Sequence, residues 1–522
     1  MSKKLIKSSL IFSFMTLISR VLGLVRDVVV ANLMGAGAAA DVFFFANKIP
    51  NFLRRLFAEG AFAQAFVPVL AEYKETKPED EVKLLIAKAS GTLGCIILMV
   101  TLFAVICAPV LVALFGTGWF IDWLHDGPNA DKFDLASSML RITFPYLFFI
   151  SLVALSGAIL NTYGRFGAAA FTPVLLNIVI ILFATLGQFE QPAFALAWGV
   201  FFGGLVQLLF QLPFLFKVGA IARPRWGWHD DGVKKIRLLM IPALFGVSVS
   251  QINLLFDTFL ASFLQTGSIS WLYYADRLLE FPLGLFGIAI STVILPQLAK
   301  DHVKSDETHF LQTMDWGVAT ICLLGLPSAV GLALLAEPML MVLFMRGAFD
   351  MTVVTHSAHS LIAYSSGLLF FMLIKVLASG FYSRQDTKTP VSIGIKAMIA
   401  NMVFNLILIF PLAHVGLALA TSMSALFNAG FLYYTLRKQG VYTMGKQVKT
   451  NLIRIILSVL IMAVFLIVYA PDSVEWLNYS TVERILNLVY LIFSGFLIYI
   501  LALFVSGARL KQFKPAAFNR LS

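Results

Sequence analysis

The chain has 522 residues, of which 59% are hydrophobic and only 13% are charged, and its mean hydropathy is +0.86. Soluble globular proteins carry about 25% charged residues, so this composition excludes a soluble enzyme or binding domain and predicts a polytopic membrane protein. The net charge of +11 does not indicate a nucleic-acid partner, because the basic residues are distributed over loops along the whole chain.

Apolar runs of about 18 residues or more, each long enough to cross a bilayer as a helix, follow one another from end to end. Membrane β-strands would instead show alternating segments of about ten residues, so we predict an all-α fold. The fourteen predicted transmembrane helices are 8–34, 41–72, 84–116, 134–161, 168–187, 193–217, 236–264, 269–299, 309–334, 354–382, 389–411, 415–436, 450–470 and 482–506.

Lysine and arginine predict the orientation of these helices, because positively charged loops remain in the cytoplasm. Every second connection is basic, from Lys3 and Lys4 at the N-terminus to Arg509 and Lys511 after the last helix. An even number of spans then places both termini in the cytoplasm. We expect these loops to contact anionic phospholipid headgroups as well.

Two stretches, Asp27–Ala71 and Asp257–Ala299, resemble copies of one helical hairpin, and each closes on the motif Pro-x-Leu-Ala. Six predicted helices separate them, so both copies enter the membrane in the same sense and form a parallel repeat. The repeat predicts two six-helix lobes, residues 1–220 and 221–440. Residues 441–522 contain two further helices that have no counterpart.

Charged residues concentrate in these hairpins and in the first helix, where each is costly inside a bilayer. In the first helix Arg20, Gly23 and Asp27 share one face at 100° per residue, and Arg26 points away from that face. An anionic ligand met inside the membrane would explain the cations. The alternative is that individual arginines form structural ion pairs or extend to the membrane surface.

The second predicted helix carries the densest group of charges. Pro50 removes a backbone hydrogen bond and should bend this helix, which would turn both Arg54 and Arg55 inward. On a regular helix, a stripe about 40° wide contains Asp41, Lys48, Arg55 and Glu59.

The second hairpin repeats the pattern with Asp276, Arg277 and Glu280 on neighbouring positions, again followed by a proline. Arginine is the side chain best suited to a phosphate or pyrophosphate, because its planar fork donates two parallel hydrogen bonds. We therefore expect these residues to bind a phosphorylated headgroup.

Asp257 lies deep in the seventh predicted helix, and Asn401 and Asn405 lie one turn apart on the eleventh. A carboxylate with two amide oxygens could coordinate Na⁺, or the carboxylate could exchange a proton. The alternative is a protonated or hydrogen-bonded aspartate without a coupling role.

Sequence signatures of an enzyme are absent, since the chain shows no nucleotide-binding glycine loop and no metal-ligand spacing of histidine or cysteine. We therefore predict a transporter that needs no cofactor other than a candidate coupling ion, Na⁺ or H⁺.

Three long motifs resemble the MurJ (MviN) family of lipid II flippases, within the multidrug/oligosaccharidyl-lipid/polysaccharide exporter (MOP) superfamily. They are SRVLGLVRD from Ser19 to Asp27, NFLRRLFAEGAF from Asn51 to Phe62, and YYADRLLEFP from Tyr273 to Pro282. The resemblance covers essentially the whole chain. It implies a twelve-helix core in two lobes, with residues 441–522 bordering a groove for a lipid tail.

The resemblance also implies the substrate, undecaprenyl-pyrophosphate carrying a disaccharide-pentapeptide. This lipid moves from the inner to the outer leaflet of the bacterial inner membrane for peptidoglycan biosynthesis, and so for cell wall biogenesis and cell shape. The positions that match the family's functional residues are Arg20, Arg26, Asp41, Arg54, Arg55 and Arg277.

We expect alternating access with hinges at Gly23 and Pro50. Wall-synthesis proteins are candidate partners. The alternatives are an exporter of drugs or of another polyprenyl-linked glycan, and a membrane scaffold that organises wall synthesis without transport.

Overall fold

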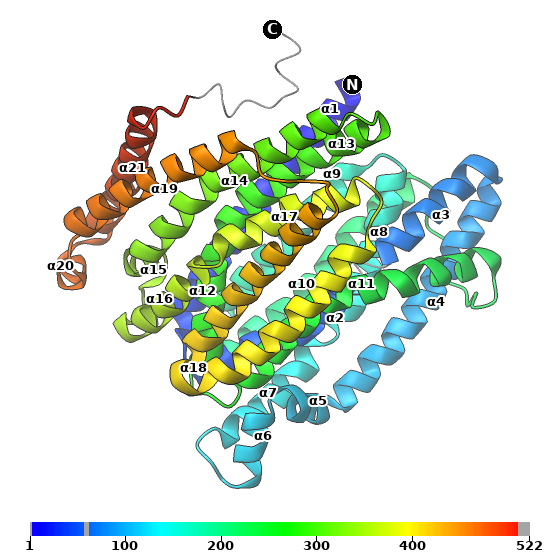
Figure 1. The fold of residues 1–522 in the computed structure, drawn as a ribbon. Coiled ribbons are helices and arrows are strands. Elements are labelled where there is room, and N and C mark those ends of the chain that lie inside the picture. Colours follow the sequence, from blue (N-terminus) through cyan, green and yellow to red (C-terminus); the bar gives the residue numbers. More distant parts are fainter. Residues whose placement is uncertain (1–2, 57–61, 510–522) are drawn as a thin grey trace. The chain divides into compact units, whose positions relative to one another are not determined.

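The structure is a computed structural model that describes residues 3–56 and 62–509 (Figure 1). Within these residues all regular secondary structure is helical, and ten helical stretches are long and apolar enough to cross a membrane. Several stretches contain two helices in succession, such as Ala130–Thr162. The chain is therefore an all-helical polytopic membrane protein, as predicted, and the count of fourteen spans stays a prediction.

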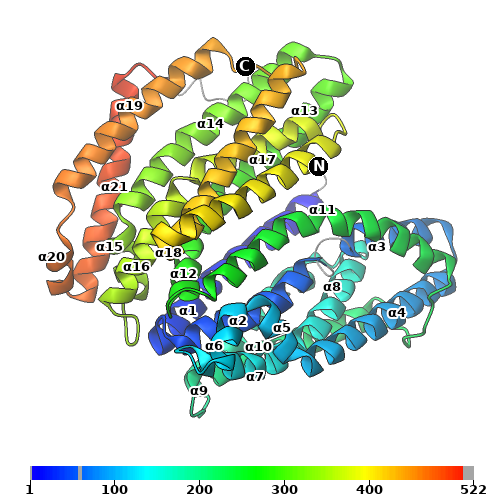
Figure 2. The same ribbon diagram turned by 60° about the horizontal axis from the view of Figure 1, so that its bottom comes forward.

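The chain forms two compact units, of which unit 1 consists of Met1–Ile269 and Arg346–Phe349. In unit 1, α1 packs on α9, α9 on α10, and α2 on α7; Figure 2 shows α2, α7 and α10 side by side. Its helices are α1 (Lys3–Met34), α2 (Ala38–Leu53), α3 (Phe62–Thr76), α4 (Glu79–Ile106), α5 (Ala108–Phe115), α6 (Thr117–Leu124), α7 (Ala130–Thr143), α8 (Tyr146–Thr162), α9 (Phe166–Leu186), α10 (Pro192–Lys217) and α11 (Asp231–Ala261).

Unit 2 consists of Ser270–Met345 and Asp350–Ser522. Here α14 contacts α13, α17 and α19, and α19 pairs with α21. Its helices are α12 (Ser268–Pro282), the π-helix η2 (Leu283–Gly287), α13 (Ile288–Val303), α14 (Glu307–Leu334), α15 (Ala336–Phe344), α16 (Met351–Ser365), α17 (Leu368–Tyr382), α18 (Lys388–Lys438), α19 (Lys446–Tyr469), α20 (Ser473–Asn478) and α21 (Thr481–Val505).

Two differences from the predicted spans have local causes. The run 84–116 is divided at Cys107, because Pro109 in the first turn of α5 cannot continue the hydrogen-bond ladder of α4. The predicted spans 389–411 and 415–436 form one 51-residue stretch, α18, in which Ala413 interrupts the helical backbone with φ +48°. The predicted gap between these two spans therefore coincides with a sharp reversal of backbone conformation.

The compact units do not divide where the predicted lobes do. The predicted lobe boundary lies at 220/221, whereas the chain passes from unit 1 to unit 2 between Ile269 and Ser270. Unit 1 includes α11 because this helix packs on α2, α3 and α5. The predicted C-terminal pair, 441–522, belongs to unit 2. The lobe boundary concerns the sequence repeat and stays a prediction.

The start of α11 shows how polar residues fix a helix end outside the apolar runs. The Asp230 carboxylate accepts hydrogen bonds from the backbone N–H groups of Gly232, at 3.0 Å, and Val233, at 3.4 Å, and forms an ion pair with Lys88 of α4. Burial by itself raises the pKa of Asp230, but the hydrogen bond from Lys88 and the N–H donors outweigh it and hold the pKa below its usual range.

Candidate functional site

The two repeated hairpins share an unusual backbone feature. In the first, α2 contains Pro50 and is followed by π-helical residues 54–56; in the second, α12 ends at Pro282 and continues into the π-helix η2. Short π-helical turns are rare and occur frequently at functional sites. This shared feature strengthens the interpretation of the two stretches as repeats. Glu59, a predicted gating residue, lies outside the described residues.

Pro50 leaves the carbonyl of Ala46 without its usual helical donor, since a proline has no N–H. The Thr143 hydroxyl of α7 donates a hydrogen bond to this carbonyl at 3.2 Å, and Thr143 is fully buried. The neighbouring helix therefore satisfies the group that the proline leaves open. Residues 54–56, directly after α2, form a wide π-helical turn, and the bend at Pro50 stays a prediction.

The cations of the first hairpin lie in different surroundings. The Lys48 ammonium donates to the Thr258 hydroxyl of α11 at 3.1 Å, and Arg54 Nε donates to Asn51 Oδ1 at 3.0 Å. Arg55 is exposed and has no hydrogen-bond or ion-pair partner among the described residues. Arg54 and Arg55 therefore differ in surroundings, and the inward turn of both side chains stays a prediction.

The charges of α1 are organised by a residue of α9. Arg26 forms an ion pair with Asp27 at 2.7 Å, and its Nη1 donates to Asn177 Oδ1 at 3.1 Å. The side chain of Arg26 is 16% exposed and that of Asp27 is 4% exposed. Arg20 is exposed without a partner in the described part of the chain. Asn177 was not among the predicted site residues, although a polar residue within the apolar run 168–187 was a usable signal.

Asp41, predicted as a substrate contact, lies in a buried ion pair. Its Oδ2 is 3.4 Å from the ammonium of Lys132 on α7 and accepts the backbone N–H of Gly267 at 2.7 Å. The side chains of Asp41 and Lys132 are 2% and 4% exposed. Lys132 also lies over the ring of Trp119, 5.4 Å from its centre. In this arrangement the carboxylate joins α2, α7 and the residue preceding α12.

In the second hairpin, Arg277 donates to Glu280 Oε2 from Nη1 at 3.0 Å. Its Nε and Nη2 donate to the Tyr273 hydroxyl at 3.3 Å and 3.2 Å. Glu280 is exposed and Arg277 is half-buried. Asp276, the third predicted residue here, is exposed and directly precedes Arg277.

The predicted site residues divide between the two units. Unit 1 contains Arg20, Gly23, Arg26, Asp41, Lys48, Pro50, Arg54 and Arg55, and unit 2 contains Asp276, Arg277 and Glu280. Within unit 1 the structure places Arg26 on the α1–α9 contact and Asp41 on the α2–α7 contact. A cavity shared by the arginines of both units stays a prediction.

The candidate Na⁺ ligands divide in the same way, because Asp257 belongs to unit 1 and both asparagines belong to unit 2. Asn405 Nδ2 donates to Asn401 Oδ1 at 3.0 Å, and Asn401 Nδ2 donates to the Thr421 hydroxyl at 3.4 Å. Within the described ranges no group of three or more histidine, cysteine or acidic residues could hold a metal. The Na⁺ site stays a prediction.

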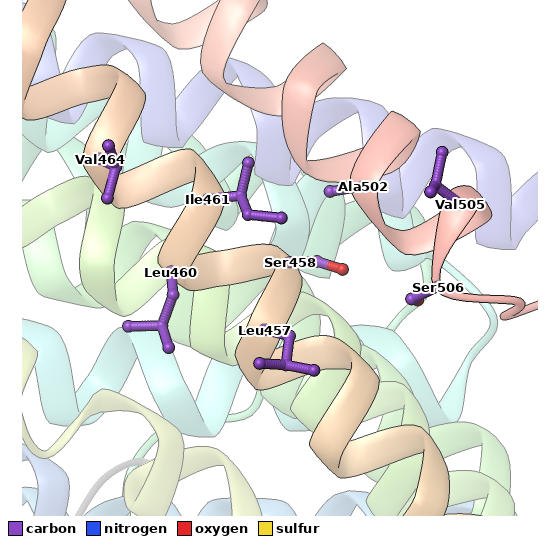
Figure 3. Close-up of a pocket in the computed structure, with 8 residues that line it drawn as sticks. All are labelled: Leu457, Ser458, Leu460, Ile461, Val464, Ala502, Val505 and Ser506. Atoms are coloured by element: carbon purple, nitrogen blue, oxygen red, sulfur yellow. The ribbon is translucent and has the colours of Figure 1, made fainter.

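A cavity of ≈ 510 Å³ lies between α19 and α21 of unit 2 (Figure 3). Its wall is almost entirely apolar, and Figure 3 shows that the lining side chains come from both helices. The residues that line it are Leu457, Ser458, Leu460, Ile461, Val464, Ala502, Val505 and Ser506. Nearby, Arg454 Nη1 of α19 donates to the Gly507 carbonyl beyond α21 at 3.1 Å.

Comparison with known proteins gives consistent matches over this fold. A family model described as "Lipid II flippase MurJ" matches residues 30–490. The probable lipid II flippase MurJ of Vibrio cholerae is 60% identical over 99% of this chain and 98% of its own length.

Solved structures agree. The chain superimposes on one described as "Lipid II flippase MurJ, inward closed conformation" with a TM-score of 0.79 and 28% identity, covering 94% of this chain and 98% of the other. An inward-facing multidrug resistance MATE family transporter of the MOP superfamily gives a TM-score of 0.67 at 14% identity over 83% of this chain and 98% of the other, and shares the fold alone.

Proposed function

This chain belongs to the MurJ family of lipid II flippases, and from this premise we propose how its residues carry the substrate. The protein is a transporter rather than an enzyme, and lipid II is the substrate that the family name gives. The family assignment does not favour the two alternatives, an exporter of drugs or other glycans and a scaffold without transport.

We propose that the arginines of α1 and of the two hairpins bind the pyrophosphate of lipid II. The observation that carries this proposal concerns two arginines, Arg20 and Arg55. Each is exposed, and neither has a hydrogen-bond or ion-pair partner among the described residues. An arginine at the centre of a membrane helix costs about 2.5 to 3.5 kcal/mol. A pyrophosphate offsets this cost, because its oxygens accept the paired N–H groups of a guanidinium.

Arg26, Arg54 and Arg277 complete this proposed site. Each is oriented by a hydrogen bond to an uncharged side chain, an amide or a phenol, so the direction of its fork is set before the ligand arrives. Lys48, on the same helix as Arg54 and Arg55, adds a cation that the Thr258 hydroxyl orients. Asp276 and Glu280 are proposed to hold the cations of the second hairpin when no substrate is bound.

The polyprenyl tail of lipid II is proposed to occupy the cavity between α19 and α21. Support comes from its lining, which consists of aliphatic side chains and two serines. Burial of apolar surface contributes about 25 cal/mol per Å² without any directional requirement, so such a groove suits a flexible chain. Tail binding and headgroup binding are then separate contributions to affinity.

The proposed topology has fourteen membrane-spanning helices in the bacterial inner membrane, with two six-helix lobes, an added C-terminal pair and both termini in the cytoplasm. The alternation of basic connections supports it. Lipid II enters from the inner leaflet and leaves to the outer leaflet by alternating access, with hinges at Gly23 and Pro50. Phospholipids and wall-synthesis proteins are proposed partners.

Coupling to Na⁺ or H⁺ is a further part of the proposal, with Asp257, Asn401 and Asn405 as the ion-binding residues. The hydrogen bond between the two asparagines supports it, since it places two amides together in α18. A leaflet-specific assay in liposomes that contain only this protein tests the coupling. Slower flipping of labelled lipid II without an ion gradient is expected, and equal rates with and without gradients contradict it.

The binding site is tested in the same liposomes with Arg55→Ala. Because Arg55 has no partner among the described residues, its removal leaves no opposite charge unpaired, and we expect flipping to fall about tenfold or more through loss of charge-assisted hydrogen bonds. Arg165→Ala is the matched control, since it removes an equal charge from an exposed turn before α9. Equal flipping by both variants would contradict the proposed site.

A further inference from the structure

Asn177 links α9 to the charged face of α1. It is 6% exposed and lies in the middle of α9, a helix that is otherwise mostly apolar. Its Oδ1 accepts a hydrogen bond from Arg26 Nη1 at 3.1 Å, and its Nδ2 donates to the backbone carbonyl of Ser19 at 3.1 Å. One buried amide thus contacts α1 just before Arg20 and at Arg26.

The orientation of this amide follows from the chemistry of its partners. Arginine can only donate hydrogen bonds and a backbone carbonyl can only accept them, so the oxygen of Asn177 must face Arg26 and its nitrogen must face Ser19. The amide of asparagine can accept the hydrogen bond from Arg26 and donate one to Ser19 at the same time. Aspartate would set a carboxylate against the Ser19 carbonyl, and leucine would form neither hydrogen bond.

The contacted residues lie on one face of α1. Ser19, Gly23 and Arg26 are spaced i, i+4 and i+7, and α9 packs against α1 with Asn177 on this face. A β-carbon at Gly23 would lie 3.8 Å from Asn177 Nδ2, which is ordinary contact distance. The amide therefore contacts two residues of α1 that lie two helical turns apart, with Gly23 between them.

We propose that Asn177 is a positioning residue for lipid II transport, which holds the Arg26 guanidinium toward the substrate without adding negative charge. This inference rests on the proposed function, in which Arg26 binds the pyrophosphate. Arg26 already forms an ion pair with Asp27. A carboxylate at position 177, in addition to that of Asp27, would weaken the attraction of the Arg26 guanidinium for an anion. A neutral amide fixes the direction of the guanidinium and preserves that attraction.

The experiment measures binding of undecaprenyl pyrophosphate and of uncharged undecaprenol to the full-length protein, with thermal stability recorded for every variant. Asn177→Leu keeps the branched shape of the side chain and removes both hydrogen bonds, so we expect pyrophosphate binding to weaken about tenfold. Binding of undecaprenol should stay unchanged. Asn177→Asp, a second variant of the same size, should weaken pyrophosphate binding at least as much.

Thr172→Val is the matched control, because Thr172 is an equally buried polar residue of α9 whose hydroxyl bonds to Gln211 and Ala168 rather than to α1. It should leave binding of both lipids unchanged. Equal losses of both lipids in the Asn177 variants, or a loss in Thr172→Val as large as theirs, would show a general packing role and overturn the inference.

The Arg26→Ala background separates this inference from the proposed function. If Asn177 acts through Arg26, Asn177→Leu has no further effect once Arg26 is absent. A further tenfold loss in that background overturns the positioning role while the role of Arg26 stands. Unchanged pyrophosphate binding in Arg26→Ala alone overturns the proposed role of Arg26 and this inference together.

Discussion

The first hairpin, α2 and α3, and the second, α12 to α13, share a backbone feature but differ in what their cations contact. In the first, Lys48 donates to a hydroxyl and Arg54 to an amide oxygen. In the second, Arg277 donates to the carboxylate of Glu280 as well as to the hydroxyl of Tyr273. The two hairpins thus share a π-helical turn, and the contacts described for the cations near each turn involve different side chains.

The start of α2 in the first hairpin carries a buried charge. The carboxylate of Asp41 is buried against Lys132 and accepts the N–H of Gly267. Gly267 directly precedes α12, so this carboxylate binds the backbone of the turn between α11 and α12. Asp41 therefore contributes to the packing of α2, and its role as a substrate contact stays a prediction, as does that of the cations further along α2.

The largest expected effect is on the buried pair at the start of the first hairpin. Lys132→Met leaves the Asp41 carboxylate without its cation, and removing one member of a buried pair costs roughly 3 to 5 kcal/mol. The double variant Asp41→Asn with Lys132→Met should recover most of the stability, because Asn can still accept the N–H of Gly267. Unfolding in detergent measures both. Normal stability with lost transport in Lys132→Met would assign the pair to the substrate instead.

A smaller effect is expected at the proline of the first hairpin. Thr143→Val keeps the shape of the side chain but leaves the buried Ala46 carbonyl without its donor, which costs about 1 to 3 kcal/mol. In a Pro50→Ala background the new N–H of residue 50 can bond to this carbonyl, so Thr143→Val should cost less. Equal costs in both backgrounds, measured by unfolding in the same detergent, would contradict the role of Thr143 as the replacement donor for this carbonyl.

The smallest expected effect on stability is in the second hairpin. The Arg277–Glu280 pair is 35% and 46% exposed, and an exposed pair contributes about 1 kcal/mol or less, so Glu280→Gln should barely change unfolding. Without the competing carboxylate, Arg277 should bind pyrophosphate about two- to fivefold more tightly, the equivalent of that small energy. Weaker binding of undecaprenyl pyrophosphate in Glu280→Gln would indicate that Glu280 supports substrate binding rather than competing with it.

Much of the architecture was predictable because it depends on local composition. Long apolar runs predicted the helices from 8–34 to 482–506, and the structure has helical segments in each of these runs. Proline marked the sites of irregular backbone at Pro50 and Pro282. The short helices α6, α15 and α20, which lie between predicted spans, were missed, since segments of six to nine residues are too short for a hydrophobic pattern to identify.

The candidate site was less predictable than the helices. Charged residues inside apolar runs identified Arg26, Asp41 and Arg277, because their cost in a bilayer makes them conspicuous. Their partners were not predictable in the same way. Neutral residues such as Asn177 and Thr258 cost less in a bilayer than charges do and are therefore weaker signals, and Lys132 lies in a connection where a charge is ordinary.

The sequence by itself determined that this is an all-helical membrane protein of the lipid II flippase family, because hydropathy and long motifs are local properties of the chain. Only the tertiary structure decided which groups meet. Arg26 and Asn177 are 151 residues apart, Lys132 and Asp41 are 91 apart, and Thr143 and Ala46 are 97 apart. Such contacts depend on how each helix is rotated and packed against its neighbours, which the periodicity of a single helix does not specify.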